Sequence, residues 1–209
     1  MTGDARNHQV ENLAARGSLV ECRIHGRGGQ GNVIAAYILA TAAFEDGRFG
    51  QAFPSFGPER RGAPVEAFVR IAEQPFRRRS QVRNPDFLVV QDETLLHVPG
   101  IIAGLRSGGG ILVNSNRAIA ELGLDRSQRA VSIPATALAT EILGRPVPNT
   151  ALLAALLTLT EIVSLEGLER ALARRFEGET LARNLRLVRE ASQRVTGRLW
   201  LEARNARTA

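Results

Sequence analysis

The sequence predicts an α/β fold, a Rossmann-like layered domain with a mostly parallel central sheet flanked by helices and a helical C-terminal part. Residues 19–25 alternate polar and apolar side chains, which is the period-two pattern of a strand. A glycine-rich turn over 26–31 and an apolar, alanine-rich helix over 33–44 follow directly, and this order is typical of layered α/β proteins. Short apolar runs, each typical of a buried parallel strand, lie at 87–90, 111–113 and 130–133.

The remaining elements place strands first and helices last. Further strands are expected over 48–53 and 65–71, and helices over 93–106, 135–143, 148–163, 165–176 and 180–198. Asn149 or Thr150 is the expected N-cap of the helix that starts at 148, and Ser164 that of the next, because short polar side chains satisfy free amides at a helix start. The last helix is amphipathic, and its expected buried face consists of Leu181, Leu185, Val188 and Val195.

The chain divides into three expected parts. These are an N-terminal arm over 1–17, a single α/β domain over 18–200 and a charged tail over 201–209. No apolar run approaches the roughly 20 residues of a membrane span. Because the first residues are also polar, we expect no membrane insertion, no signal peptide and a cytoplasmic location.

All basic residues are arginine, and the formal charge is +6. Without lysine the chain has neither a Schiff-base lysine nor a P-loop lysine, although a compositional bias of the source genome explains the absence. The arginines cluster only at 60–61, 77–79 and 174–175, and a single Trp and a single Tyr offer few rings for stacking on bases. We therefore expect no nucleic-acid partner.

The cysteine and histidine residues predict no metal site in this chain. Cys22 is the only cysteine, so the chain alone cannot form a disulfide, hold an iron–sulfur cluster or build a structural zinc site. Its place in the middle of a strand indicates a small buried side chain. His8, His25 and His97 show no ligand spacing, and of these only His25 adjoins the glycine-rich turn.

The turn over 26–31 matches the pattern G-x-G-x-x-G at Gly26, Gly28 and Gly31, between a strand and a helix. In dinucleotide-binding folds such glycines let the backbone approach a pyrophosphate at the start of a helix. Within the turn, Arg27 and Gln30 offer donors to an anion or to a partner's backbone.

Three interpretations of this turn stay open from the sequence. It serves close strand–helix packing together with a subunit contact, it binds a phosphate-bearing ligand, or it is part of a complete NAD site. A complete site needs an acidic residue at the end of the second strand, about 20 residues further on. Glu45 and Asp46 lie near that spacing, but they precede the second predicted strand.

The segment 51–65, QAFPSFGPERRGAPV, is rich in proline and glycine and suits neither a helix nor a central strand. Such a loop loses little entropy on ordering, so it is suited to docking or to clamping a ligand. It contains no Ser/His or Cys/His pair, and we predict no catalytic residue in this chain. The candidate ligand or subunit contacts are Gly26, Arg27, Gly28, Gly29, Gln30, Gly31, Ser55, Phe56, Glu59, Arg60, Arg61, Asn149 and Thr150.

Four motifs carry a resemblance to a known family. They are IHGRGGQG at 24–31, the proline-rich segment at 51–65, Asn-Pro-Asp at 84–86 and Pro-Asn-Thr at 148–150. With these motifs the sequence resembles the gamma subunit of the pyruvate:ferredoxin oxidoreductase family, the 2-oxoacid:acceptor oxidoreductases. The resemblance extends over about 20–195.

The resemblance implies a subunit of a thiamine-diphosphate-dependent complex that decarboxylates a 2-oxoacid oxidatively to an acyl-CoA. Alpha, beta and delta-type partner subunits would hold thiamine diphosphate, magnesium and the iron–sulfur clusters, and this chain alone would bind no cofactor. Electrons would pass to ferredoxin or to an NAD-reducing subunit. The chain would support assembly and the approach of coenzyme A, with Arg60 and Arg61 facing coenzyme A phosphates or a sister subunit, or pairing only with Glu59.

Two alternatives to this function stay open. The chain could be a stand-alone nucleotide-binding oxidoreductase of Rossmann type that uses the glycine-rich turn, or a purely structural scaffold subunit. The sequence does not distinguish pyruvate, 2-oxoglutarate, branched-chain and aryl 2-oxoacids as substrates, because other subunits would line most of that pocket.

Overall fold

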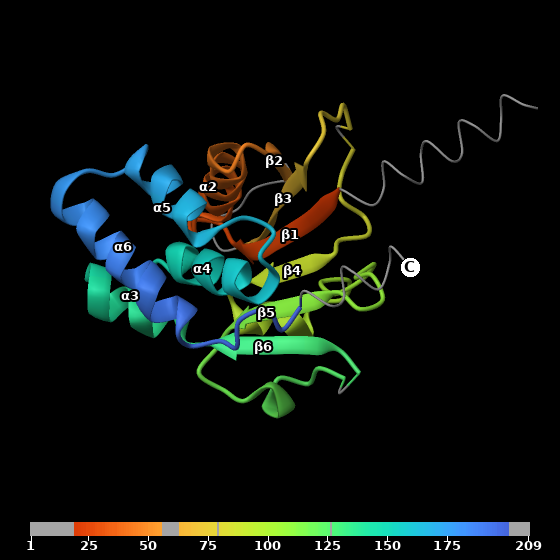
Figure 1. Cartoon of the computed structure of the whole chain (residues 1–209). Helices are drawn as coiled ribbons and strands as arrows, with labels where there is room; N and C mark the ends of the chain where they lie inside the picture. Colours follow the sequence, from red (N-terminus) through yellow and green to blue (C-terminus); the bar gives the residue numbers. More distant parts are fainter. Residues whose placement is uncertain (1–18, 56–62, 79, 126, 201–209) are drawn as a thin grey trace, which may run out of the picture.

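A mixed six-stranded sheet forms the centre of the computed structural model, which describes residues 19–55, 63–78, 80–125 and 127–200 (Figure 1). The strands lie in the order β2-β3-β1-β4-β5-β6. Their bounds are β1 Val20–Arg27, β2 Phe49–Ser55, β3 Pro64–Ala72, β4 Phe87–Val90, β5 Gly110–Asn114 and β6 Arg129–Ile133. β1, β4, β5 and β6 run parallel, and β3 is antiparallel to both β1 and β2. The predicted mostly parallel α/β sheet is therefore confirmed.

The helices of the described residues pack together on one face of this sheet (Figure 1). Their bounds are α2 Asn32–Glu45, α3 Ala135–Leu143, α4 Asn149–Thr160, α5 Leu165–Ala173 and α6 Gly178–Ser192. Apolar side chains from all of them join the strand residues Cys22, Ile24, Val69, Val89 and Leu112 in one core. Burial of this continuous apolar surface is the main stabilising contribution to the fold.

The opposite face is covered by two short 3-10 helices, η1 (Glu93–His97) and η2 (Ile119–Glu121), and by turns. The predicted helix over 93–106 is wrong, because Pro99 interrupts it and Gly100 and Gly104 have positive φ angles of 90° and 75°. The irregular segment has a use in the fold, since its carbonyl oxygens remain free to accept hydrogen bonds.

Arg23 on β1 uses those carbonyls. Its NH2 nitrogen donates to the carbonyl oxygens of Ile101 at 2.8 Å and Ala103 at 2.7 Å. The polar side of β1 is therefore buried as well as the apolar side, since Glu21, Arg23 and His25 are at most 7% exposed. The alternation that predicted this strand therefore belongs to a strand buried on both faces.

The helix boundaries correct several expectations. The N-cap of α4 is Pro148, and Asn149 and Thr150 are the first residues inside the helix. The prediction that Asn149 or Thr150 caps this helix is therefore wrong. Ser164 is confirmed as the cap of α5, where its Oγ accepts from the Gly167 amide at 2.9 Å. α4 ends before 163 because Glu161 has a φ of 48°.

α5 and α6 also end before the predicted residues 176 and 198. On α6, Val188 is buried as expected, whereas Leu185 is only half-buried. Leu187, absent from the expected face, is fully buried. The division into an arm, a domain and a tail stays a prediction, because 1–18 and 201–209 lie outside the described residues.

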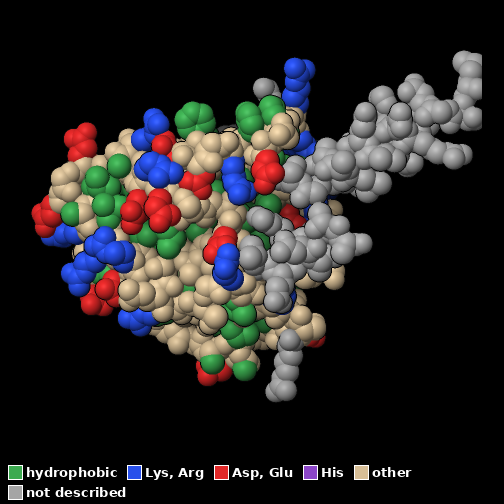
Figure 2. Space-filling view, viewed as in Figure 1, with side chains coloured by type: hydrophobic (Ala, Val, Ile, Leu, Met, Phe, Trp, Pro, Cys, Tyr) green, Lys and Arg blue, Asp and Glu red, His purple; other side chains and the backbone are tan. Residues whose placement is uncertain are grey.

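The absence of a nucleic-acid partner stays a prediction. On the face shown in Figure 2, basic and acidic side chains are interspersed over the helices. None of the helices in the described ranges combines the length and the apolar character that a membrane-crossing segment needs.

Candidate functional site

The two loops singled out in the sequence meet at one edge of the sheet. β1 ends at Arg27, which pairs with Pro64 at the start of β3. The Gly28 amide donates to the carbonyl oxygen of Ala63 at 3.0 Å. Ser55 at the end of β2 pairs with Glu66 on β3. The glycine-rich turn and both described ends of the proline-rich segment are therefore neighbours, whereas the candidates Phe56, Glu59, Arg60 and Arg61 lie outside the described residues.

Close packing explains two glycines of the motif. A Cβ on Gly26 would lie 2.2 Å from Asn32 Oδ1, and one on Gly31 would lie 2.6 Å from Asn149 Nδ2. Gly31 also has a φ of 80°, a conformation that side chains disfavour. Gly29 has a φ of 94°, but a Cβ there would meet nothing within 4 Å. Gly29 thus leaves the outer side of the turn open.

Arg27 and Gln30 bind within the chain. Arg27 Nε donates to Asp92 Oδ2 at 2.8 Å, its NH2 donates to Thr94 Oγ1 at 2.6 Å, and its amide donates to Gln30 Oε1 at 2.7 Å. Partial burial acts to raise the pKa of Asp92, but hydrogen bonds from Thr94 and the Arg27 guanidinium outweigh it and lower the pKa below its usual value. These contacts hold the turn against the end of β4.

Asn149 and Thr150, from the Pro-Asn-Thr motif at 148–150, lie beside the glycine-rich turn. Asn149 Nδ2 donates to the carbonyl oxygen of Gly31 at 3.0 Å, and Thr150 Oγ1 donates to Asn184 Oδ1 at 2.8 Å. Both residues are at most 5% exposed. The start of α4 is therefore fixed against the glycine-rich turn at the start of α2.

The arrangement does not fit a complete dinucleotide site of Rossmann type. Such a site needs the second parallel strand beside the first, but antiparallel β3 lies between β1 and β2. Glu45 and Asp46 lie at the far end of α2, where Asp46 Oδ1 accepts from Ser164 Oγ at 2.7 Å and from Arg170 NH2 at 2.9 Å. These carboxylates join α2 to α5 and are not ribose ligands.

His25 and Cys22 are buried, and neither side chain is a candidate for catalysis. His25 Nε2 accepts from Arg23 Nε at 2.8 Å, and its Nδ1 lies 3.5 Å from Glu66 Oε1. Burial, with a smaller contribution from Arg23, lowers the pKa of His25 to about 3, so the ring is neutral at pH 7. Cys22 is fully buried, as predicted, and burial raises the pKa of its thiol.

The carboxyl ends of β4 and β5 contribute polar residues that the sequence candidates omit. Asn114 Nδ2 donates to the carbonyl oxygen of Gln91 at 2.9 Å and to Thr136 Oγ1 at 2.7 Å. The side-chain amide of Gln91 is buried, and neither its Nε2 nor its Oε1 has a hydrogen-bond partner among the described residues. The sequence could have identified Gln91 and Asn114, because each is a polar residue directly after a predicted buried strand. The carboxyl ends of such strands form the edge of the sheet where α/β proteins bind ligands.

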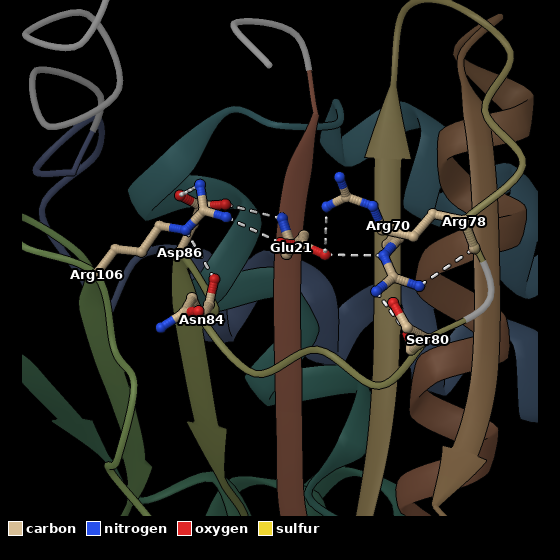
Figure 3. A network of polar contacts seen from close by, with 7 residues as sticks. All are labelled: Glu21, Arg70, Arg78, Ser80, Asn84, Asp86 and Arg106. Atoms are coloured by element: carbon tan, nitrogen blue, oxygen red, sulfur yellow. Dashed lines mark hydrogen bonds and ion pairs between the residues drawn. The ribbon is translucent and has the colours of Figure 1, made fainter. Parts of the chain in front are cut away.

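A second polar cluster lies at the amino end of β1 (Figure 3). Glu21 lies between Arg70, whose Nε is 2.8 Å from Glu21 Oε1, and Arg106, whose NH2 is 3.0 Å from Oε2. Arg78 approaches Glu21 Oε1 at 3.8 Å, so one residue of the 77–79 cluster takes part in an internal network. This network lines a polar cavity of about 680 Å³ at the opposite end of β1 from the glycine-rich turn.

Comparison with known proteins places the whole arrangement in one family. Residues 21–194 match the pyruvate ferredoxin/flavodoxin oxidoreductase family. Pyruvate synthase subunit PorC of Methanosarcina barkeri is 49% identical over 152 residues, which are 73% of this chain and 84% of that protein. The pyruvate/ketoisovalerate oxidoreductases common subunit gamma of Thermococcus litoralis is 44% identical over 180 residues, which are 85% of this chain and 97% of that protein.

A solved structure shows the same fold. The crystal structure of pyruvate oxidoreductase subunit PORC from Thermotoga maritima superposes with a TM-score of 0.75 at 38% identity, covering 86% of this chain and 98% of that one. The sequence match, the six-stranded sheet and the nearly complete coverage of these subunits agree. The chain belongs to the pyruvate ferredoxin/flavodoxin oxidoreductase family, as one of its gamma-type subunits.

Proposed function

We propose that this gamma-type subunit works in a multisubunit, thiamine-diphosphate-dependent 2-oxoacid:acceptor oxidoreductase. The complex would convert a 2-oxoacid, coenzyme A and an oxidised acceptor into acyl-CoA, CO₂ and the reduced acceptor, which is ferredoxin or NAD. Relatives whose names specify pyruvate and ketoisovalerate oxidoreductases support this reaction class. The substrate of this complex would come from the same class of 2-oxoacids.

The side chains of this subunit suit a subunit that packs beside the redox centres better than one that binds them. An iron–sulfur cluster needs four thiolates, and the single thiol here is fully buried with a raised pKa. Within the described ranges, no group of His, Cys, Asp and Glu could hold a metal ion. Thiamine diphosphate, magnesium and the clusters would therefore lie in alpha, beta and delta-type partner subunits.

The chain itself would support assembly and receive coenzyme A at the carboxyl end of β1. The observation that carries this proposal is the convergence of three separate motifs there. The Gly28 amide donates to the carbonyl oxygen of Ala63 in the proline-rich segment, and Asn149 Nδ2 donates to that of Gly31. Arg60 and Arg61 belong to that segment, and their guanidinium groups would bind coenzyme A phosphates or acidic groups of a sister subunit.

The test is a double substitution, Arg60→Ala with Arg61→Ala, in the complex co-expressed with its partner subunits. Coenzyme A binding predicts a KM for coenzyme A raised about tenfold or more while the subunits still co-purify. Arg189→Ala with Arg194→Ala removes the same charge from two exposed arginines near the end of α6 and should leave this KM within about twofold. Weakened assembly with an unchanged KM would support the scaffold alternative instead.

A stand-alone nucleotide-binding oxidoreductase is the other alternative. It is disfavoured because β3 separates β1 from β2 and Glu45 and Asp46 bind at the far end of α2. Size-exclusion chromatography of the purified chain, with and without candidate partners, addresses it directly. A stable monomer that binds NAD with micromolar affinity would contradict the proposed function.

A further inference from the structure

The polar cavity of about 680 Å³ lies at the amino end of β1, at the other end of this strand from the glycine-rich turn. Its floor is formed by Glu21 and Arg70, whose side chains are 5% and 1% exposed. Leu19 is the single apolar residue among the described residues that line it. The exposed residues of its rim are Arg78, Ser80, Gln81, Arg83 and Asn84.

The Asn-Pro-Asp motif at 84–86 shapes this cavity (Figure 3). Asp86 Oδ2 accepts from the Glu21 amide at 2.9 Å, and the Asn84 carbonyl oxygen accepts from Arg106 Nε at 2.8 Å. The Arg106 amide donates to the carbonyl oxygen of Pro85 at 3.0 Å. Of the four motifs that carry the family resemblance, this one lies at the opposite end of β1 from the other three. It therefore builds a second polar surface on the subunit.

The floor of the cavity is electrically balanced. Arg70 Nε lies 2.8 Å from Glu21 Oε1, and Arg106 NH2 lies 3.0 Å from Glu21 Oε2. Arg106 NH1 also lies 3.8 Å from Asp86 Oδ1. Two guanidinium groups thus match two carboxylates. The Arg70 side chain is held further by the Ser80 carbonyl oxygen, which accepts from its NH2 at 2.6 Å.

The rim adds two positive charges that the floor does not neutralise. Arg78 NH1 is 3.8 Å from Glu21 Oε1, which is too long for a hydrogen bond, and the Arg78 side chain is 46% exposed. Arg83 is exposed, and its guanidinium has no ion pair or hydrogen bond among the described residues. Both groups are therefore able to bind an anion from outside the chain.

The polar lining favours carboxylates of another protein over a small organic ligand. Small molecules bind mainly in cavities with apolar walls, which this cavity lacks. The planar guanidinium group binds a carboxylate through two parallel N–H donors. Arginine is enriched in protein–protein interfaces, where complementary charges orient the partner. A segment with at least two neighbouring Asp or Glu residues matches the two charges at the rim.

We infer that this cavity docks an acidic segment of a sister subunit, with carboxylates of that segment bound at Arg78 and Arg83. The inference rests on the proposed function, because it requires the multisubunit complex. It gives the assembly role of this chain a defined surface at the amino end of β1, separate from the three motifs at the carboxyl end.

The first test measures the salt concentration at which this chain dissociates from the co-expressed complex in size-exclusion chromatography. Arg78→Gln with Arg83→Gln removes both rim charges and should lower this concentration about twofold or more, because salt screens exposed charge pairs. Arg189→Gln with Arg194→Gln removes the same charge near the end of α6 and should leave it nearly unchanged. Circular dichroism and melting temperature establish that both variants are folded.

The second test identifies the occupant, because the chain contains no lysine. Arg78→Lys keeps the positive charge and introduces the only side-chain amine. A carbodiimide activates a carboxylate in contact with this amine, and the two join as an amide without a spacer. In the complex we expect a cross-link to an Asp or Glu of a sister subunit, located by mass spectrometry. Arg189→Lys carries the same amine outside the cavity and should give at most about a tenth of this product.

The outcomes separate the inference from the proposed function. A cross-link to residues 1–18 of the same chain, or to a second copy of it, would assign the cavity to another occupant and overturn the inference. No cross-link above that of Arg189→Lys, or equal salt sensitivity of the two double variants, would also overturn it. The coenzyme A-dependent rate of the wild-type complex is measured alongside. A normal rate with any of these results leaves the proposed function standing, whereas the lack of that rate contradicts the proposed function whatever the cross-link shows.

Discussion

Asn149 Nδ2 donates to the carbonyl oxygen of Gly31 at 3.0 Å, joining positions 118 residues apart and fixing the start of α4 against the start of α2. The contact requires glycine at 31, because a Cβ there would lie 2.6 Å from Asn149 Nδ2. Two of the motifs that the family resemblance rests on are thus one structural unit. This unit positions the glycine-rich turn.

Gly31→Ala should lower the free energy of unfolding by about 2–4 kcal/mol, since backbone strain and displacement of Asn149 add up. Gly29→Ala is the matched control. It has a similar positive φ but would meet no atom within 4 Å, so only the strain of about 1–2 kcal/mol applies. Urea denaturation of both variants measures the difference. Equal losses would show that the Asn149 contact contributes nothing.

Arg70→Met should destabilise the fold by about 3 kcal/mol, because it removes a buried partner of Glu21. Arg70 also donates to the Ser80 carbonyl oxygen at 2.6 Å, so the connector after β3 should loosen as well. Arg117→Gln breaks an exposed pair with Glu121 and should cost less than about 1 kcal/mol. Thermal melts of the two variants test this, and a loss for Arg70→Met no larger than for Arg117→Gln would contradict the network.

Stability should fall as the pH decreases from about 6.5 to 5. The folded-state pKa of His25 is lowered to about 3, so the unfolded chain binds a proton in this range while the folded chain does not. The stabilising contribution of the neutral His25 ring is complete above the unfolded pKa of about 6.5. It is lost progressively as the pH falls toward the folded pKa, by at most about 1.4 kcal/mol per pH unit.

His25→Gln should flatten this slope, measured by urea denaturation between pH 5 and 7.5. His97→Gln, at an exposed position, is the parallel substitution that controls for loss of an imidazole. A wild-type slope retained in His25→Gln would assign the pH dependence to other groups.

Cys22 should not react with a thiol reagent in the native protein. Its side chain is fully buried and burial raises its thiol pKa, so the reactive thiolate is scarce and shielded. Titration with Ellman's reagent should give no modification over an hour in buffer and one thiol per chain in guanidinium chloride. Modification within minutes under native conditions would show that the sheet opens readily around β1.

Periodic segments of the sequence predicted the fold well. The strand at 87–90 and the helix at 135–143 have the predicted boundaries, because apolar runs and glycine punctuation are local signals. The helix over 93–106 failed where Pro99 and Gly100 outweigh helix propensity. The insertion of antiparallel β3 between β1 and β2 could not be predicted, since strand order depends on pairing between distant segments.

Part of the site was accessible from the sequence and part was not. Gly26 and Gly31 were recognisable from their motif, yet the reason for each is a contact with Asn32 or Asn149 that only the folded chain shows. A cavity of about 430 Å³ beside the glycine-rich turn arises from the starts of α2, α4 and α6, which are far apart in the sequence. Arg145 at its rim carried no sequence signal, because a single arginine after a helix resembles any solvated residue.

We propose that this chain is a required gamma-type subunit of a coenzyme A-dependent 2-oxoacid oxidoreductase. The most direct measurement is the rate of acceptor reduction by the co-expressed complex with and without this chain, for a 2-oxoacid in the presence of coenzyme A. We expect omission to abolish the coenzyme A-dependent rate and addition of the purified chain to restore it. A full coenzyme A-dependent rate without this chain would contradict the account.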